Sequence, residues 1–564
     1  MKRILLYTAA MCIGAATAAA QDLSKEITVD RTVVPQEREA QRLSGINPEI
    51  ISPQISPKTL LPTEYTRPGQ LRSDLTVLSA APWRQTVPHT PYRGYASIGY
   101  FPAYNLGASA GYRFISDERS DAGAWLNYNG CSYKGDDATK DTSFGRHFFT
   151  IGADGKHRFN DRSTLSADLT YAYSSVGHPS ADDKYTQTAN DLRFGLSWLS
   201  SVGMFGYDLG ARVEYFGFGK ADPLLEKFDP NKQTLLDFNI GAGLINDNDT
   251  DANRCLGIDI NAKLLHTNNF IDISGDNPIP ASATIALYHF NPYFHMAFGD
   301  AMVRLGLSAD LSHVPGQNKF RAAPDVMLSY APLSTFAAWL RLDGGIDMAT
   351  CADMFAIDPY LGSFNQYGLS QTPLSIEGGW NIGPFSGFTV GVFGGYAKVN
   401  NWLMPVAFNS GGTFRTEYAP LDVKGWHAGA ELAYEYKNLF KISAKAETAA
   451  SSDDKCTTAW YQWRDRAKWA FSAEAEVTPT DPLSVTIGYQ ARTGRKAIDL
   501  ISADKATTVD LDDSGNLYLG ASYRITPQFT AFANAENLLG KRWLYASGVP
   551  SQGVKGLVGV AYKF

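Results

Sequence analysis

The sequence predicts an all-β fold: a single large antiparallel transmembrane β-barrel of about 22 strands, preceded by an extended proline-rich segment. Three observations predict it. The chain begins like an exported protein, and after residue 20 it has no apolar run near the roughly 20 residues that a spanning helix needs. From Arg93 onward, apolar and polar residues alternate in stretches of about ten residues. The expected divisions are therefore residues 1–20, 21–92 and 93–564.

The first 20 residues have the layout of a secretory signal peptide. Lys2 and Arg3 precede a mostly apolar run over residues 4–16, and small residues end at Ala20. Removing the two cations changes the formal net charge from -7 to -9. An acidic chain has no electrostatic attraction for phosphate backbones, so no nucleic-acid partner is expected.

Residues 21–92 contain nine prolines and no sustained hydrophobic period. Proline-rich sequence favours extended, irregular backbone, so this segment is predicted to lie in the periplasm or to enter the barrel.

The alternation predicts which face of each strand meets lipid. Trp426, Leu432 and Tyr436 share one face of a predicted strand, whereas His427, Glu431 and Glu435 share the other. A cationic side chain at the lipid midplane costs roughly 2–4 kcal/mol, so the polar row is expected to line a wet lumen.

The predicted connections alternate in length. They are tight after even-numbered strands, as at 437–438, and long after odd ones, as at 349–369, 400–422, 451–466 and 497–513. Outer-membrane barrels distribute short periplasmic turns and long outside loops in this way. Since lipid leaves no water for an open sheet edge, the sequence favours one closed barrel with both ends in the periplasm.

A motif close to the C-terminus resembles the last hairpin of TonB-dependent receptors. It comprises Glu536, Asn537, Leu538, Leu539, Gly540, Lys541, Arg542 and Trp543, followed by Gly548 and Pro550. The alternating Val560, Tyr562 and Phe564 resemble the terminal signal that outer-membrane barrels present to the assembly machinery. The resemblance implies the bacterial outer membrane, about 22 strands and a receptor or transport role.

The chain departs from that family in two places. Val554 and Lys555 stand where many members have arginine. Members also carry a folded plug domain before the barrel, and the 72 residues from 21 to 92 are too few for a standard one. Residues 26–34 are similar to the short segment through which such receptors contact TonB, although an ordinary polar stretch is the competing interpretation.

No residue pattern indicates catalysis or a cofactor. Residues 247–251 have half of a calcium-loop spacing but lack its turn glycine and closing glutamate, so a solvated turn is favoured. His427, Glu431 and Glu435 in one row, and His289 with His295 in another, are interpreted as lumen lining rather than metal sites, because residues four apart on a strand lie about 13 Å apart. The protein is not expected to be an enzyme.

The long loops are rich in aromatic residues, and two interpretations of them stay open. Trp402, Phe408, Tyr418, Trp460 and Trp463 suit contact with a ligand. Alternatively, the loops fold over the barrel mouth and bury these side chains in one another. Cys351 and Cys456 lie in two of these loops, and a disulfide between them is a hypothesis.

Two functions follow from these patterns. The first is a receptor-like or transport-like barrel for an unidentified solute. The second is a non-transporting barrel that acts as the scaffold of a surface or assembly complex with a lipoprotein partner. In either case something has to close so wide a barrel, and residues 21–92, the long loops or a partner are the candidates.

Overall fold

The computed structural model describes residues 92–135, 143–178, 185–219, 229–245, 254–270, 281–315, 317–363, 368–410, 413–437, 439–463, 467–502, 505–546 and 549–564. The chain divides into two compact units, Met1–Ile51 and Ser52–Phe564, and all described residues belong to the second. The expected signal peptide and the segment 21–91 lie outside the described residues, as do residues 26–34 and 247–251.

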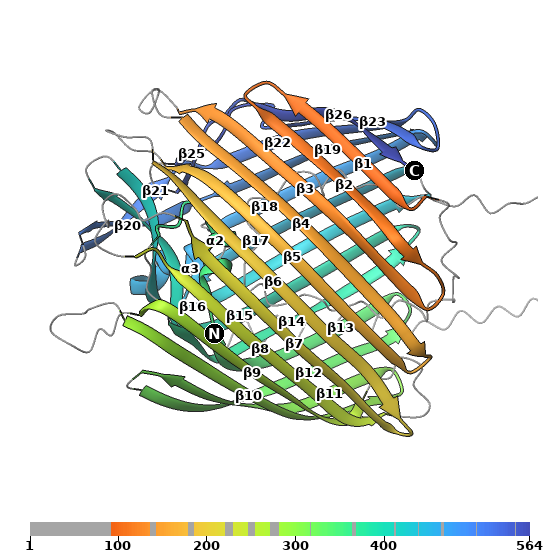
Figure 1. Cartoon of the computed structure of the whole chain (residues 1–564), viewed down its shortest axis with the longest axis vertical. Helices are drawn as coiled ribbons and strands as arrows, with labels where there is room; N and C mark the ends of the chain where they lie inside the picture. Colours follow the sequence, from red (N-terminus) through yellow and green to blue (C-terminus); the bar gives the residue numbers. More distant parts are fainter. Residues whose placement is uncertain are drawn as a thin grey trace, which may run out of the picture. The chain divides into compact units, whose positions relative to one another are not determined.

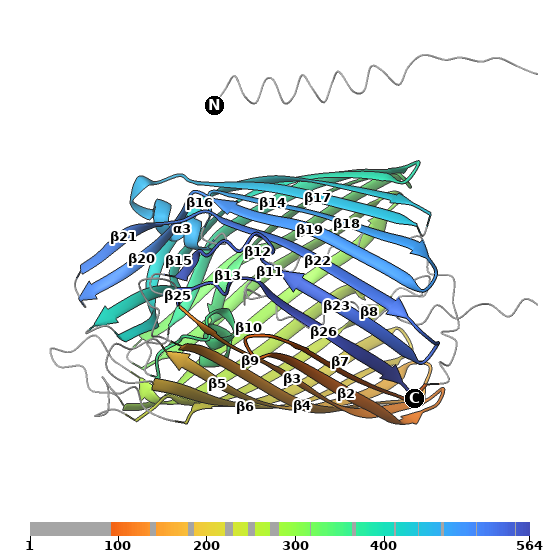
Figure 2. The same cartoon turned by 90° about the horizontal axis from the view of Figure 1, so that it is seen from above.

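Among the described residues, 22 strands form one closed antiparallel ring (Figures 1 and 2). The strands of the ring are β1 (Gly94–Phe101), β2 (Asn105–Ser116), β3 (Ser120–Lys134), β4 (Ser143–Asn160), β5 (Ser163–His178), β6 (Tyr185–Val202), β7 (Phe205–Phe218), β8 (Lys232–Ile245), β9 (Arg254–Phe270), β10 (Ala281–Phe298), β11 (Ala301–Val314), β12 (Gln317–Leu333), β13 (Phe336–Met348), β14 (Leu369–Phe385), β15 (Phe388–Ser410), β16 (Thr413–Tyr436), β17 (Phe440–Ser451), β18 (Trp469–Thr480), β19 (Leu483–Thr493), β22 (Ser514–Arg524), β23 (Phe529–Glu536) and β26 (Lys555–Lys563).

The first and last strands close the ring. β1 pairs with both β2 and β26. At the rim, the backbone N–H groups of Arg93 and Gly94 donate to the carbonyl oxygen of Phe564 at 2.8 and 2.7 Å. The predicted closed barrel and the predicted number of strands are therefore confirmed.

Exposure alternates along each strand as the barrel requires. On β16, Trp426 is 45% exposed and Leu432 is 41% exposed, whereas His427 between them in sequence is 4% exposed. The same period holds on β7, where Leu209 and Val213 face outward and Glu214 is buried. The outward face is apolar because it meets hydrocarbon, and the inward face carries the charges.

The remaining elements lie in connections at one rim, which is opposite the C-terminus in Figure 1. They are α2 (Cys351–Ile357), η3 (Asp454–Cys456), α3 (Thr457–Trp463), β20 (Arg495–Ser502), β21 (Lys505–Leu511), β24 (Leu544–Ala546) and β25 (Val549–Pro550). Within the described ranges, no helix is long and apolar enough to cross a membrane.

Two of the predicted long connections contain paired strands: 497–513 holds most of β20 and β21, and 400–422 extends two strands of the ring. Residues 400–410 and 413–422 continue β15 and β16 as a long hairpin, which pairs from Phe388↔Tyr434 to Ser410↔Thr413. The prediction of a loop over 400–422 was wrong because the alternation weakens there. Residues on both faces are buried in the two clusters described below: Leu403, Met404, Val406 and Ala407.

Candidate functional site at the barrel mouth

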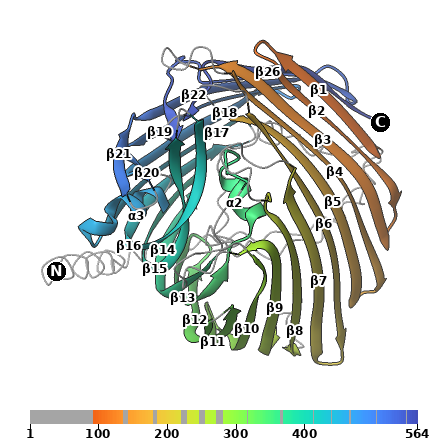
Figure 3. The ribbon, with the colours of Figure 1, turned by 60° about the vertical axis from the view of Figure 1, so that its left-hand side comes forward.

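The connection from β13 to β14 folds into the barrel mouth, and we call its residues 344–363 the inner strap. Its helix α2 begins with a capping box: the Thr350 hydroxyl accepts from the Asp353 N–H at 3.1 Å, and the Asp353 carboxylate accepts from the Thr350 N–H at 3.0 Å. Four of the seven residues of α2 are buried, and Figure 3 shows the helix surrounded by strands.

A hydrophobic cluster around α2 joins strands from both sides of the ring. Met354 and Phe355 of α2 are 1% and 9% exposed. The rings of Phe216 and Phe218 on β7 lie 5.7 and 6.0 Å from the Phe355 ring. The other buried members of the cluster are Tyr133, Phe144, Val176, Ala189, Cys351, Ala352, Tyr360, Leu361, Leu403, Ala407, Tyr418 and Val549. The strap therefore ties β3–β7 to β15 and β16 across the mouth.

Hydrogen bonds hold the strap to the hairpin of β15 and β16. The Tyr418 hydroxyl donates to the Met354 carbonyl oxygen at 2.8 Å, and the Thr416 hydroxyl donates to the Asp358 carboxylate at 2.9 Å. The backbones of Leu361 and Thr416 form a parallel bridge. Since these contacts lie in a buried cluster, they fix the strap as part of the folded barrel.

The strap is also held on its other side, by β8. The side-chain oxygen of Gln233 accepts from the Cys351 N–H at 2.7 Å, and the Asn231 N–H donates to the Ser363 carbonyl oxygen at 2.8 Å. Cys351 and Ser363 of the strap are thereby attached to the barrel wall.

A second buried cluster forms the base of the neighbouring loop, which connects β17 to β18. α3 packs on β15, β16, β17 and β20, and Trp460 is fully buried. The ring of Trp463 lies 4.8 Å from Trp460 and 6.3 Å from Trp402. This cluster is a small folded core above the barrel wall.

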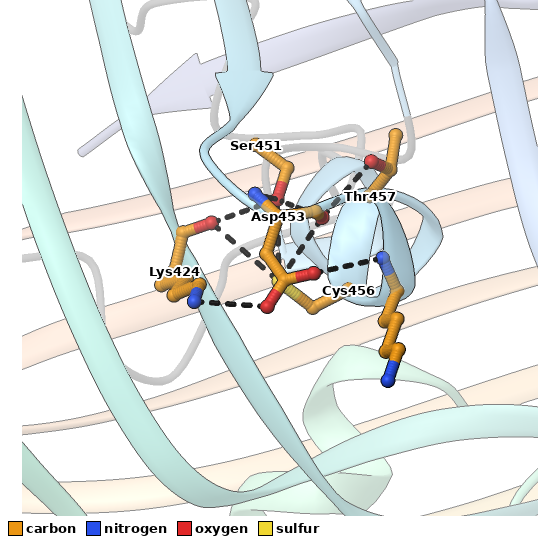
Figure 4. Close-up of polar contacts among 6 residues, drawn as sticks. Lys424, Ser451, Asp453, Cys456 and Thr457 are labelled. Carbon is orange, nitrogen blue, oxygen red and sulfur yellow. Dashed lines mark hydrogen bonds and ion pairs between the residues drawn. The ribbon is translucent and has the colours of Figure 1, made fainter.

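Polar contacts fix the start of that loop (Figure 4). The Lys424 ammonium lies 2.9 Å from the Asp453 carboxylate, which also accepts from the Lys455 N–H at 3.0 Å. The hydrogen bond from Lys424 and the one from the Lys455 backbone hold the pKa of Asp453 below its usual value. The Ser451 hydroxyl and the Cys456 sulfur lie 3.2 Å apart.

The aromatic residues proposed as ligand contacts are mostly structural. Tyr418, Trp460 and Trp463 are 3%, 0% and 8% exposed, so they belong to the two clusters and a ligand does not reach them in this conformation. Trp402 is half-buried against α3, and the side chain of Phe408 lies outside the described residues. In the structure, the loops bury Tyr418, Trp460 and Trp463 in their own hydrophobic clusters, as the alternative interpretation describes.

The disulfide hypothesis needs correction, because Cys351 and Cys456 are both free thiols. Cys351 is fully buried beside Asn231, which directly precedes β8, and the Asn231 side-chain nitrogen lies 3.7 Å from its sulfur. Cys456 instead lies beside Ser451, at the end of η3. The two loops fold into separate cores, and this separates the thiols.

The inward faces of the strands carry ion pairs. His427 lies 3.4 Å from Glu377, whereas Glu431 and Glu435 are exposed on the same face of β16. His289 lies 2.6 Å from Asp310 on the next strand. Among the described residues, no group of three His, Cys, Asp or Glu side chains is placed to hold a metal ion.

The C-terminal motif forms the connection from β23 to β26. Glu536 pairs with Lys555 at 2.9 Å, and the Asn537 side chain donates to the carbonyl oxygens of Lys541 and Gln552 at 2.6 and 2.9 Å. Trp543 and Ser551 exchange backbone and side-chain hydrogen bonds, and the carbonyl oxygen of Pro550 accepts from the Tyr133 hydroxyl. Leu538 and Leu539 are exposed, Gly540 takes a positive φ, and Gly548 lies outside the described residues.

The terminal residues form an outward aromatic row. Val560, Tyr562 and Phe564 are 38%, 41% and 48% exposed on one face of the last strand and its end. Phe564 stacks on Tyr562 at 5.9 Å and on Tyr112 at 6.1 Å.

Sequence reasoning missed the strap and its anchor on β11. The Asp310 carboxylate is 1% exposed and accepts from the Ile346 N–H at 2.7 Å. Two local signals stood in the sequence: Thr350 and Asp353 at capping-box spacing, and the pair Gly344-Gly345 at the entry to the strap.

No protein-family model and no curated protein matches the sequence. Solved structures do match its fold. The FrpB iron transporter from Neisseria meningitidis has a TM-score of 0.62 at 10% identity, covering 84% of this chain and 81% of its own. The siderophore receptor PirA from Acinetobacter baumannii has a TM-score of 0.61 at 11% identity, covering 84% and 80%. The ferric enterobactin receptor PfeA from Pseudomonas aeruginosa, bound to BCV-L6, has a TM-score of 0.61 at 11% identity, covering 84% and 81%.

At such low identity the likeness concerns the fold. This chain has the large closed 22-strand barrel that the alternating sequence predicted, and this fold indicates the bacterial outer membrane.

Proposed function

We propose that this protein is an outer-membrane transport receptor whose mouth is closed at rest by its own inner strap. The observation that carries the proposal is the buried cluster around α2, which ties β3–β7 to β15 and β16 over a polar lumen. A membrane scaffold needs only a sealed wall, whereas a wide barrel with a folded internal cover suits controlled passage. The neighbours named as siderophore receptors and an iron transporter support the same role.

The proposal extends to the parts of the chain outside the described residues. Residues 1–20 direct export, and residues 21–92 enter the lumen from the periplasmic side, where β1 begins. Residues 26–34 contact TonB, the terminal row up to Phe564 is read by the assembly machinery, and both barrel ends are periplasmic. The substrate is a solute that the polar lumen admits.

Four proteins would test the closure: the full chain, a variant lacking 21–92, a variant with residues 349–363 replaced by a Gly/Ser linker, and the combination. Each is inserted into planar bilayers and its conductance is measured. The combination is expected to conduct as a wide pore, and each single variant to conduct less. A combination that stays closed would mean that neither segment seals the barrel.

Mild detergent extraction separates transport from the scaffold role. A copurified solute together with an uptake defect on deletion supports transport. A stoichiometric lipoprotein, with no solute and no uptake defect, would instead support the scaffold.

A further inference from the structure

β12 loses its partner halfway along its length. β11 pairs with all of β12, from Ala301↔Tyr330 to Val314↔Gln317. β13 pairs with β12 only up to Val326↔Leu342. Residues 317–325 therefore have no strand partner on their second edge among the described residues. Phe320 on this stretch is 71% exposed, whereas the lipid-facing Leu328 below it is 37% exposed.

The missing partner lies inside the barrel. β13 turns inward at Gly345, whose φ is 138°, and stays paired with β14 up to Met348↔Leu369. The N–H of Ile346 is held by Asp310 of β11. Ile346 and Met348 then pack on the inner faces of β8, β9 and β10, against Leu235, Leu265, Ile285 and Leu287. Ile346 and Met348 thus bury their side chains against the inner face of the barrel wall, whereas the lower residues of β13 on the same side meet lipid.

The sequence of the tip is also patterned to continue the lost pairing. Extending the register from Val326↔Leu342 sets Ala322 opposite Ile346 and Phe320 opposite Met348, which are apolar pairs on the outward face. It sets Arg321 opposite Asp347, an ion pair on the lumen face.

Neither member has an oppositely charged atom within ion-pair distance in the inward position among the described residues, and the nearest charges are those of Lys263 for Asp347 and of Asp310, opposite in register, for Arg321. Arg321 Nε is buried with no hydrogen-bond partner among the described residues. The Asp347 carboxylate accepts from the adjacent Met348 N–H at 2.8 Å. The one like-charged pair of the extended register, Asp325 opposite Asp343, is already neutralised, since Arg304 lies 3.3 Å from Asp325 and Arg341 lies 2.9 Å from Asp343.

We propose that residues 343–351 switch between this inward position and an outward position in which they pair with residues 317–325 of β12, drawing α2 out of the mouth. The inward position holds the resting state because it buries the α2 cluster. The outward position gains a completed ladder, which is favourable because an unpaired sheet edge at a membrane is costly. The gating role of this switch rests on the proposed function, whereas the two positions themselves do not.

Paired cysteines can detect each position, in a background in which Cys131, Cys255, Cys351 and Cys456 are replaced by alanine. The pair Arg321→Cys with Asp347→Cys reports the outward position. The pair Leu361→Cys with Thr416→Cys reports the inward one, because these residues bridge there. The pair Met327→Cys with Arg341→Cys is the matched control, since these residues are neighbours in both positions.

At rest, the inward and control pairs are expected to oxidise and the outward pair to stay reduced. Adding Phe355→Ala removes a buried ring from the α2 cluster and is expected to shift the equilibrium outward by roughly 100-fold, so that the outward pair then oxidises. An outward pair that stays reduced in the Phe355→Ala protein, while the control pair oxidises and the barrel keeps its heat-dependent migration on gels, would overturn the switch.

Measurements of conductance and uptake distinguish a failure of the switch from a failure of the proposed transport function. Oxidising the inward pair is expected to abolish solute uptake and any strap-dependent conductance, and reduction is expected to restore both. If the outward pair forms but locking the strap changes neither quantity, the two positions exist and the transport proposal fails.

Discussion

Replacing Trp460 with alanine is expected to unfold the α3 loop while leaving the barrel intact. The indole of Trp460 is 0% exposed and is the largest fully buried side chain in the described residues. Truncating a buried Trp costs about 3–5 kcal/mol. The cluster is a separate small core on the barrel wall, so this cost falls on local opening and raises the open population of the loop by roughly 100- to 5,000-fold.

Trypsin measures this opening because Lys455 is exposed next to α3. When opening is fast relative to cleavage, the cleavage rate follows the open population, so the variant is expected to be cut at Lys455 far faster than the parent. Trp460→Phe is expected to behave nearly like the parent, since the indole N–H makes no hydrogen bond among the described residues.

The matched control is Trp426→Ala, which removes an outward ring of 45% exposure on β16. It is expected to leave cleavage at Lys455 unchanged. Equal cleavage rates for Trp460→Ala and the parent would refute the idea that this cluster holds the loop.

Three further predictions concern the strap and the loops. Gly345→Ala is expected to destabilise the strap by about 1–3 kcal/mol, because the φ of residue 345 is 138° and the new Cβ would lie 2.6 Å from a carboxylate oxygen of Asp310. Faster labelling of the Cys351 thiol in this variant would show the loss of stability. Because the pKa of Asp453 is lowered in the folded protein, its contribution to loop stability is present above the unfolded pKa and is lost as pH falls through the folded pKa. Cleavage of the loop by an acid protease is expected to rise over that pH range. Asp453→Asn is expected to remove this pH dependence. A maleimide is expected to modify Cys456 in the native protein with or without reductant, and Cys351 only after unfolding. If both thiols become reactive only after reduction, the disulfide hypothesis is restored.

The barrel could be predicted because its physics is local and periodic. Lipid on one side and water on the other impose a two-residue period, so Trp426 and His427 could be assigned to opposite faces from sequence alone. A barrel of this kind also has tight turns at one rim and longer loops at the other, and the sequence shows this alternation of short and long connections.

The mouth could not be predicted in the same way, because its structure depends on contacts between distant segments. α2 has seven residues, too few for a hydrophobic period to show, and its buried side lies against β7 and β16, more than 60 residues away in sequence. Trp460 and Trp463 have the composition of a binding loop, and only the fold shows that they bury each other. The inward turn at Gly345 depends on Asp310, whose acceptance of the Ile346 N–H leaves no trace in local sequence.

The pairing of β1 with β26 bears on biogenesis. The seam joins the span nearest the start of the described chain to the one that ends at Phe564, so no nascent fragment can become watertight. The ring can therefore close only after β26 has been exported. A truncated chain that lacks β26 would expose two unpaired strand edges, and it would not form a smaller closed pore.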